Sequence, residues 1–235
     1  MGMVTLPLQT KGVFGMKVIL FGGTGMVGQG VLRECLVDAR VEQVMLVVRK
    51  ATGASHAKVV ELEQEDFFDW TGVAPRFEGY DACLFCLGVS AVGMKEEPYR
   101  RTTYDLTLGV AEVLVKQGVK SFLYVSGQGT DEHERSMWAR VKGETESALM
   151  RLPFAHVYCF RPGYIQPMYG IRSKIGWYNA VYDVLGWAYP VLRRMAARYV
   201  TSTDEVSRAM VNVAVDGYTK QVLETRDIHE AAEQS

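Results

Sequence analysis

The sequence predicts an α/β fold, a doubly wound parallel sheet with helices on both faces and a small helical cap near the C-terminus. Short apolar runs rich in β-branched residues alternate along the chain with segments of helical periodicity, and this alternation demands right-handed crossovers between parallel strands. No repeat, linker or low-complexity tract divides the 235 residues, of which 48% are hydrophobic. We therefore expect an N-terminal extension at residues 1–15 and one domain at residues 16–235, with cap elements at about 164–203.

The first predicted strand, at residues 17–21, leads into a glycine-rich turn that reads GGTGMVG and then into a helix at residues 27–36. Glycines in such a turn allow a positive φ, let backbone N–H groups approach a pyrophosphate, and let the helix pack close to the strand. The helix N-terminus also favours an anion. We therefore predict a dinucleotide-binding loop, and the alternative is a structural turn without a ligand. The candidate cofactor-binding residues are Gly22, Gly23, Thr24, Gly25, Met26 and Val27.

The second predicted strand ends in Arg49 and Lys50. An NAD enzyme usually has an acidic residue at this distance beyond the glycine loop, which binds the ribose 2′-hydroxyl, whereas an arginine can bind a 2′-phosphate. The two basic residues therefore favour NADP over NAD, unless they are an ordinary pair at a strand end. Asp66 and Phe67 follow the third predicted strand and are candidates for the adenine site. A plain acidic surface loop explains them equally well.

The remaining elements continue the same alternation. Gly88 follows the fourth predicted strand and would let the backbone approach the cofactor, so Leu87 and Gly88 are further candidates. Ser136 and Thr203 are expected to cap the helices that they precede. We expect strands at residues 44–48, 58–62, 81–87, 120–125, 154–160 and 221–224, and helices at residues 98–116, 136–150 and 203–215.

The segment at residues 175–192 is apolar and aromatic. Asn179, Asp183 and Pro190 argue against a membrane span. We interpret the segment as a core or lid helix over the substrate cleft, and the alternatives are a homodimer interface and a helix on a membrane surface. One helical face would hold Trp177, Val181, Val184, Leu185, Ala188 and Leu192.

Charge and cysteine usage argue against several classes of function. The net charge is -1, so no general attraction to nucleic acid or to an anionic membrane is expected. Cys83 and Cys86 lie three residues apart on a predicted strand, so they should point to opposite faces and share neither a metal nor a disulfide. The four histidines show no close ligand spacing, and no metal site is expected. Buried thiols suit a reducing compartment, and we expect a cytoplasmic protein.

Four motifs in a fixed order resemble those of the short-chain dehydrogenase/reductase superfamily: GGTGMVG, YVSG, WARVK and RPGYIQP. The chain most resembles the atypical branch related to the Tat-interacting-protein family and its bacterial relatives, with NmrA-like proteins more distant. The resemblance implies a Rossmann-type fold, an NAD(P) cofactor and a small-molecule substrate. It also implies catalytic roles for Ser126 and Lys142, ribose binding by Lys142, and a loop beside the nicotinamide that contains Pro162, Gly163 and Ile165.

The sequence departs from this superfamily at two positions. Family members often have two serines after the fifth strand, whereas here Ser126 is followed by Gly127. The superfamily has a tyrosine four residues before the lysine, which transfers a proton to or from the substrate oxygen. Here that position is Trp138, and an indole cannot serve as an acid or base. Tyr164, Tyr124 or His133 could substitute, and the sequence does not distinguish among them. Two functions remain open: an NADP(H)-dependent oxidoreductase with an unusual proton donor, and a non-catalytic NADP(H)-binding sensor or scaffold.

Overall fold

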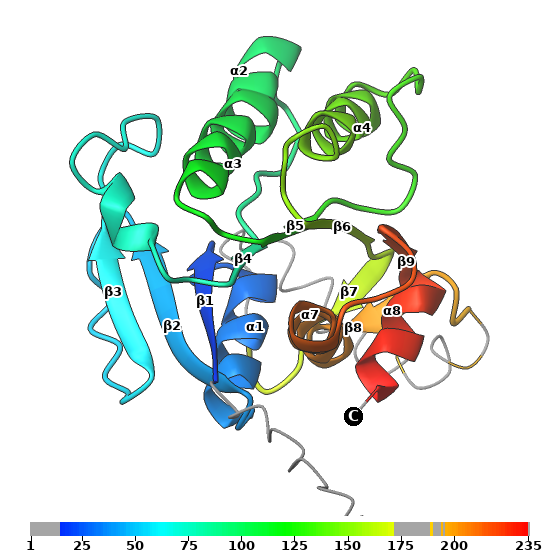
Figure 1. Ribbon diagram of the computed structural model, residues 1–235. Helices are drawn as coiled ribbons and strands as arrows, with labels where there is room; N and C mark the ends of the chain where they lie inside the picture. The colour runs from blue at the N-terminus through cyan, green and yellow to red at the C-terminus, as the bar shows by residue number, and fades with distance from the viewer. Residues whose placement is uncertain (1–14, 172–188, 190–193, 195, 235) are drawn as a thin grey trace, which may run out of the picture.

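The computed structural model describes residues 15–171, 189, 194 and 196–234 (Figure 1). Its centre is a seven-stranded sheet in the order β3-β2-β1-β4-β5-β6-β9, and all neighbouring strands are parallel. Strand β1 lies inside the sheet. Strands β2 and β3 follow on one side of it, and β4, β5, β6 and β9 follow on the other. This confirms the doubly wound parallel sheet. The strands are β1 (Met16–Phe21), β2 (Val41–Val48), β3 (Val59–Glu63), β4 (Ala82–Phe85), β5 (Ser121–Val125), β6 (His156–Arg161) and β9 (Val222–Glu224).

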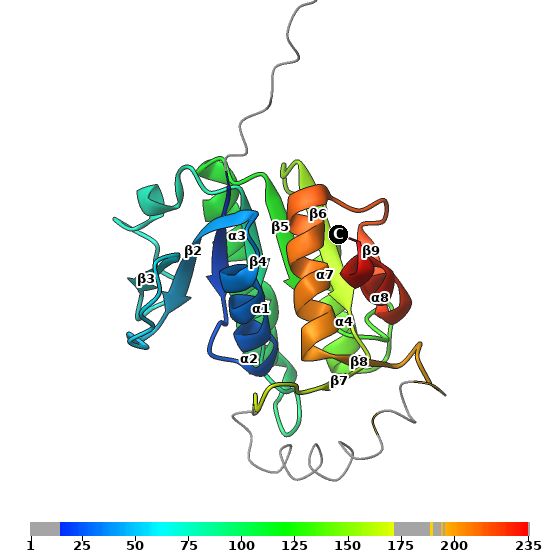
Figure 2. The same cartoon turned by 90° about the horizontal axis from the view of Figure 1, so that it is seen from below.

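Helices cover both faces of the sheet (Figures 1 and 2). One face carries α2 (Glu96–Arg100), α3 (Leu106–Lys116) and α4 (Met137–Leu149). The helices α1 (Met26–Val37), α7 (Thr203–Asp216) and α8 (Thr225–Glu233) lie on the other face, side by side in Figure 2. A π-helical turn, η2 (Arg101–Asp105), joins α2 to α3, so the helix expected at residues 98–116 is interrupted. A short 3-10 helix, η1 (Ala74–Phe77), precedes β4.

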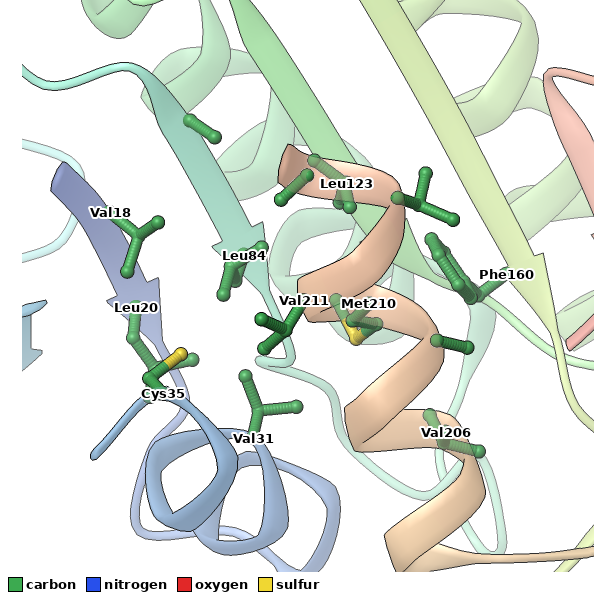
Figure 3. Close-up of a cluster of buried hydrophobic side chains, with 14 of the residues drawn as sticks. Val18, Leu20, Val31, Cys35, Leu84, Leu123, Phe160, Val206, Met210 and Val211 are labelled. Atoms are coloured by element: carbon green, nitrogen blue, oxygen red, sulfur yellow. The ribbon is translucent and has the colours of Figure 1, made fainter. Parts of the chain in front are cut away.

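Alternation along the strands divides the core into two layers. Val18 and Leu20 on β1 face α1 and α7 (Figure 3), whereas Ile19 and Phe21 belong to the layer beneath α3. This is the pattern of a strand buried on both faces, with successive side chains pointing to opposite sides. Cys83 lies in the second layer and Cys86 packs against the first, which confirms that the two thiols point to opposite faces.

The cap of α7 and the end of β4 differ from expectation, whereas the N-cap position of α4 is as expected. Thr203 is wrong as the cap of α7, because Ser202 accepts the Glu205 N–H and Glu205 binds back to the Ser202 N–H, forming a capping box. Ser136 does take the N-cap position of α4, although its hydroxyl makes no cap hydrogen bond. Strand β4 ends at Phe85, so Leu87 and Gly88 lie in the loop beyond it.

The C-terminal part contains elements that the sequence did not predict. Strands β7 (Tyr164–Gln166) and β8 (Val200–Ser202) form a separate two-stranded parallel sheet. Helix α8 packs on α7 and buries Ile228, Ala231 and Ala232 against the sheet. The proposed helical face at residues 175–192 and the extension at residues 1–14 lie outside the described residues.

Candidate functional site

The glycine turn after β1 is shaped by close backbone contacts. Gly22 has a φ of 78°, in the region that glycine tolerates, and a Cβ there would lie 2.6 Å from the backbone carbon of Cys86. A Cβ on Gly28 would lie 2.1 Å from the Gly22 carbonyl oxygen. The Gly25 N–H donates to that same oxygen over 2.8 Å. Helix α1 therefore begins in direct contact with the turn, as a pyrophosphate-binding loop requires.

The first turn of α1 is suited to an anion. Gly25 is the N-cap and supplies no side-chain hydrogen bond, and the first turn contains no acidic residue. The N–H groups at a helix start have no partner within the helix, and the helix dipole places partial positive charge there. The residues present therefore fit the diphosphate of a dinucleotide.

A cavity of about 580 Å³ opens beside this turn, at the carboxyl ends of β1, β4, β5 and β6. This is the edge at which doubly wound sheets bind their ligands. Ten of the predicted site residues line it: Gly25, Met26, Val27, Leu87, Gly88, Ser126, Lys142, Pro162, Gly163 and Ile165. The cavity wall also contains Cys86, Val89, Val125, Gly127, Gln128 and Trp138, which the sequence did not assign to the cofactor.

The predicted residues beyond β2 and β3 do not line this cavity. Arg49 and Lys50 are exposed at the end of β2 and form no ion pair within the described part of the chain. The Asp66 carboxylate accepts the Phe68 N–H over 2.9 Å in a local turn. The Phe67 side chain is buried and lies edge-on to Phe21, with ring centroids 5.9 Å apart.

Lys142 reaches the cavity from the first half of α4. Its Nζ donates to the backbone carbonyl of Ser126 over 2.6 Å. An ammonium has three N–H donors, and the described residues accept no other hydrogen bond from this one. Burial lowers the pKa of Lys142 from 10.5 to about 8, while the charge of Glu146 acts in the opposite direction. Lys142 therefore contributes a positive charge to the cavity wall, and two of its donors make no hydrogen bond to the described residues.

The Ser126 hydroxyl is hydrogen-bonded to a residue that does not line the cavity. It donates to a carboxylate oxygen of Glu146, and it lies 3.2 Å from the carbonyl of Phe160. A serine has one proton to donate. The same carboxylate binds Arg161, whose Nε lies 3.1 Å from both oxygens. Glu146 was not predicted as a site residue, although its place four residues after Lys142 puts both on one side of α4.

Trp138 lies in the cavity wall and is 37% exposed. Its indole packs over the turn after β5, because a Cβ on Gly129 would be 3.7 Å from the ring. None of the three expected substitutes for the tyrosine lines the cavity within the described residues. Tyr124 is 2% exposed, and burial holds the pKa of its hydroxyl well above 10. The Tyr164 hydroxyl donates to Gln166 over 2.8 Å, and the side chain of His133 is 87% exposed.

Two further features bear on the kind of site. Among the described residues, no three histidine, cysteine or acidic side chains gather in a way that could hold a metal ion. The helices in that part of the chain also fall short of the length and apolarity needed to span a bilayer.

Solved structures share this fold over most of the chain. WbmG from Bordetella bronchiseptica, in complex with NAD, superposes with a TM-score of 0.65 at 15% identity, covering 96% of this chain and 79% of that one. A mutated uronate dehydrogenase superposes with a TM-score of 0.63 at 17% identity, covering 88% and 73% of the two chains. Identities this low establish the Rossmann-type fold and nothing further.

Sequence relatives are more informative about the family. Protein HTATIP2 of Rattus norvegicus is 30% identical over 158 residues, which cover 66% of this chain and 63% of that protein, less than two thirds of its length. The mitochondrial protein FMP52 of Saccharomyces cerevisiae is 25% identical over 223 residues, 91% of this chain and 95% of that protein. The family model described as NAD(P)H-binding matches residues 22–151, from the glycine turn through α4. The chain therefore belongs to the NAD(P)H-binding family, and its sequence is similar to those of HTATIP2 and FMP52.

Proposed function

We propose that the protein is an NADP(H)-dependent oxidoreductase that interconverts a carbonyl and an alcohol, with Lys142 as the proton donor. The observation that carries this proposal is the place of the Lys142 ammonium, which lies in the cavity wall with one donor on the Ser126 carbonyl. Cys86 is the other titratable side chain among the described lining residues, and burial raises the pKa of its thiol far above neutrality. Lys142 is thus the group in the described wall that can release a proton near pH 8.

The cofactor would be held by backbone and side chains on both sides of the cavity. The turn from Gly22 to Gly28 would bind the diphosphate, and Lys142 would bind the nicotinamide ribose. When bound, the cofactor supplies a hydride to the substrate carbon. This chain's own contribution is a positive charge and a proton at the substrate oxygen, both from Lys142.

NADP is the preferred form of the cofactor in this proposal. Arg49 and Lys50 are exposed at the end of β2. In dinucleotide-binding folds, residues at this place bind the 2′ group of the adenosine ribose. A guanidinium without an ion-pair partner among the described residues can bind the 2′-phosphate through two N–H groups. An acidic residue at this position would repel that phosphate, and neither residue is acidic.

Calorimetry with NADP and NAD tests binding and cofactor choice together. Arg49→Ala should weaken NADP binding about tenfold or more, the loss of a charge-assisted contact, and leave NAD binding unchanged. Lys116→Ala is a matched control, because Lys116 is an exposed cation at the far end of α3. Equal loss in both variants, or none in Arg49→Ala, would rule out the 2′-phosphate contact.

Turnover is tested separately with a panel of aldehydes, ketones and quinones and the oxidation of NADPH. Steady oxidation that Lys142→Met abolishes, with NADPH still bound, supports the proposed proton donor. Binding of NADPH without turnover on any member of the panel would favour the second candidate.

That second candidate is a non-catalytic NADP(H)-binding sensor or scaffold. It is favoured by Trp138 in the cavity wall and by the Ser126 hydroxyl, which donates to Glu146. The indole cannot transfer a proton to a ligand, and the proton of the Ser126 hydroxyl is already donated to Glu146. A sensor must bind its protein partner with an affinity that depends on the cofactor, because coupling between two sites is reciprocal. Equal partner binding with and without NADP(H) would exclude this role.

A further inference from the structure

We propose that Glu146 is a positioning residue whose buried carboxylate orients Ser126 and supplies the opposite charge for the Lys142 ammonium at the cavity wall. Glu146 itself does not line the cavity. It acts through a hydrogen bond to Ser126 and through its charge on the same helix. The effect on Lys142 is a property of the free protein, and only its consequence for turnover rests on the function proposed above.

Glu146 is held as a carboxylate by a guanidinium fork. Its side chain is 3% exposed and accepts from Nε and Nη2 of Arg161 on β6. A second carboxylate, Glu224, accepts from Nη1 of the same guanidinium over 3.3 Å. A buried charge is tolerated only when it is paired and hydrogen-bonded. Both oxygens of Glu146 meet that condition, so its negative charge is fixed in place.

Ser126 connects this carboxylate to Lys142. Its N–H donates to the Phe160 carbonyl over 2.8 Å, its hydroxyl donates to Glu146, and its own carbonyl accepts from Lys142 over 2.6 Å. These three hydrogen bonds fix the orientation of the Ser126 residue. The position of the Lys142 ammonium therefore depends on the hydrogen bond that the Ser126 hydroxyl donates to Glu146.

Glu146 is also the charge that most favours the ammonium form of Lys142. Burial alone acts to neutralise the amine, and the charge of Glu146 opposes it. The Tyr124 ring on β5 lies 5.9 Å from the Lys142 Nζ, and Cys86 after β4 lines the same cavity. The guanidinium of Arg161 on β6 is paired with Glu146 and Glu224. Burial keeps the Tyr124 and Cys86 groups neutral. The charged groups where α2 meets α4 form ion pairs of their own: Arg100–Glu144 and Arg140–Glu96.

A purely structural role predicts a different outcome on substitution. A buried ion pair adds little net stability compared with apolar residues of the same size, although breaking it by removing one partner is costly. If Glu146 were only structural, its substitution would change the stability of the variant. The pKa of Lys142 would stay unchanged. A positioning role requires the ionisation of Lys142 itself to move.

The experiment is an NMR titration of the 235-residue chain without cofactor, after reductive methylation of its lysines with 13C-formaldehyde. Lys142→Arg identifies the Lys142 signal by its absence. In Glu146→Gln the titration midpoint of Lys142 should fall by about one pH unit relative to wild type, as expected for removing a nearby opposite charge. Glu224→Gln is the matched control: it also removes a carboxylate from Arg161, and it should leave the midpoint unchanged.

An unchanged Lys142 midpoint in folded Glu146→Gln, or an equal shift in Glu224→Gln, would overturn the proposal. If Glu146→Gln does not fold, the double substitution Glu146→Gln with Arg161→Gln leaves no buried charge unpaired, because Glu224 is partly exposed, and the Lys142 midpoint should still lie below the wild-type value. In Glu146→Asp the charge is retained, and the midpoint should return toward the wild-type value.

The pH dependence of kcat/KM separates this proposal from the function on which its consequence rests. If Lys142 is the proton donor, the alkaline limb of the profile in Glu146→Gln should shift to lower pH by as much as the NMR midpoint. An NMR shift without a matching kinetic shift would show that Glu146 affects the titration midpoint of Lys142. It would also show that Lys142 is not the proton donor.

Discussion

The carbonyl oxygen of Gly22 lies 2.1 Å from the position that a Cβ on Gly28 would occupy. No side chain fits at Gly28 unless α1 moves away from the turn after β1. The constraint is one of space and involves backbone atoms, which cannot rotate aside as a side chain would. The glycine is therefore needed to build the anion site, whichever ligand the site holds.

Gly28→Ala should destabilise the fold and weaken NADP(H) binding together. Overpacking of this kind costs about 1–3 kcal/mol, and the displaced helix start no longer presents its N–H groups to the diphosphate. Urea unfolding and calorimetry measure the two effects. Full retention of NADP(H) affinity in a folded Gly28→Ala protein would place the diphosphate elsewhere.

Gly109→Ala is the matched control. Gly109 lies within α3, and a Cβ there meets no atom within 4 Å apart from its own helix. Replacing glycine by alanine inside a helix should stabilise the protein by roughly 0.5–1 kcal/mol. NADP(H) binding should not change. The opposite signs of the two stability effects would separate the contact at Gly28 from a general effect of alanine.

Ser126→Ala should reduce turnover by less than about tenfold, because its hydroxyl donates to Glu146 and not into the cavity. A serine that polarised the substrate oxygen would instead be worth about 100-fold or more in kcat. Stability should fall by about 1 kcal/mol, since Glu146 loses one of its donors. Steady-state kinetics decide between the two roles: a loss of 100-fold with unchanged NADPH affinity would restore Ser126 as a catalytic residue.

Trp138→Tyr places a phenol four residues before Lys142, the arrangement that the resemblance to reductases implies. If the protein is an oxidoreductase, kcat for NADPH oxidation should rise about 100-fold, a typical contribution of a positioned acid. Trp138→Phe removes the indole without adding a hydroxyl and should bring no gain. Equal rates in the two variants would mean that a phenol at this position does not reach the substrate oxygen.

The fold and the glycine turn beside the cavity follow from short-range patterns in the sequence. The apolar runs mark all seven strands of the sheet, and the glycine spacing marks the turn at Gly22. Ser126 and Lys142 meet in the structure because each lies at the same edge of a parallel sheet, one after β5 and one on α4. That placement depends on topology alone, which the order of strands and helices already specifies.

Contacts between distant residues were not predictable in the same way. Glu146 and Arg161 are 15 residues apart on a helix and a strand, and a charged side chain on a helix is ordinarily a solvent-facing one. Helix α8 was not predicted, because its sequence, TRDIHEAAE, is mostly polar and its buried apolar side chains are one isoleucine and two alanines. The cap at Ser202 competes with Thr203, and only the position of Glu205 decides between them.

The stability of the fold should depend on pH through Lys142. Because burial lowers its pKa in the folded state to about 8, the unfolded chain holds this proton more tightly between pH 8 and pH 10.5. Stability rises with pH wherever the unfolded state binds more protons, so the ammonium destabilises the fold at neutral pH and ceases to do so as it deprotonates. Relative to Lys142→Met, the free energy of unfolding of the wild-type protein should therefore increase by about 1–3 kcal/mol from pH 7 to pH 10. Urea unfolding of both proteins at several pH values measures the difference, and two parallel curves would show that Lys142 titrates alike in the folded and unfolded states.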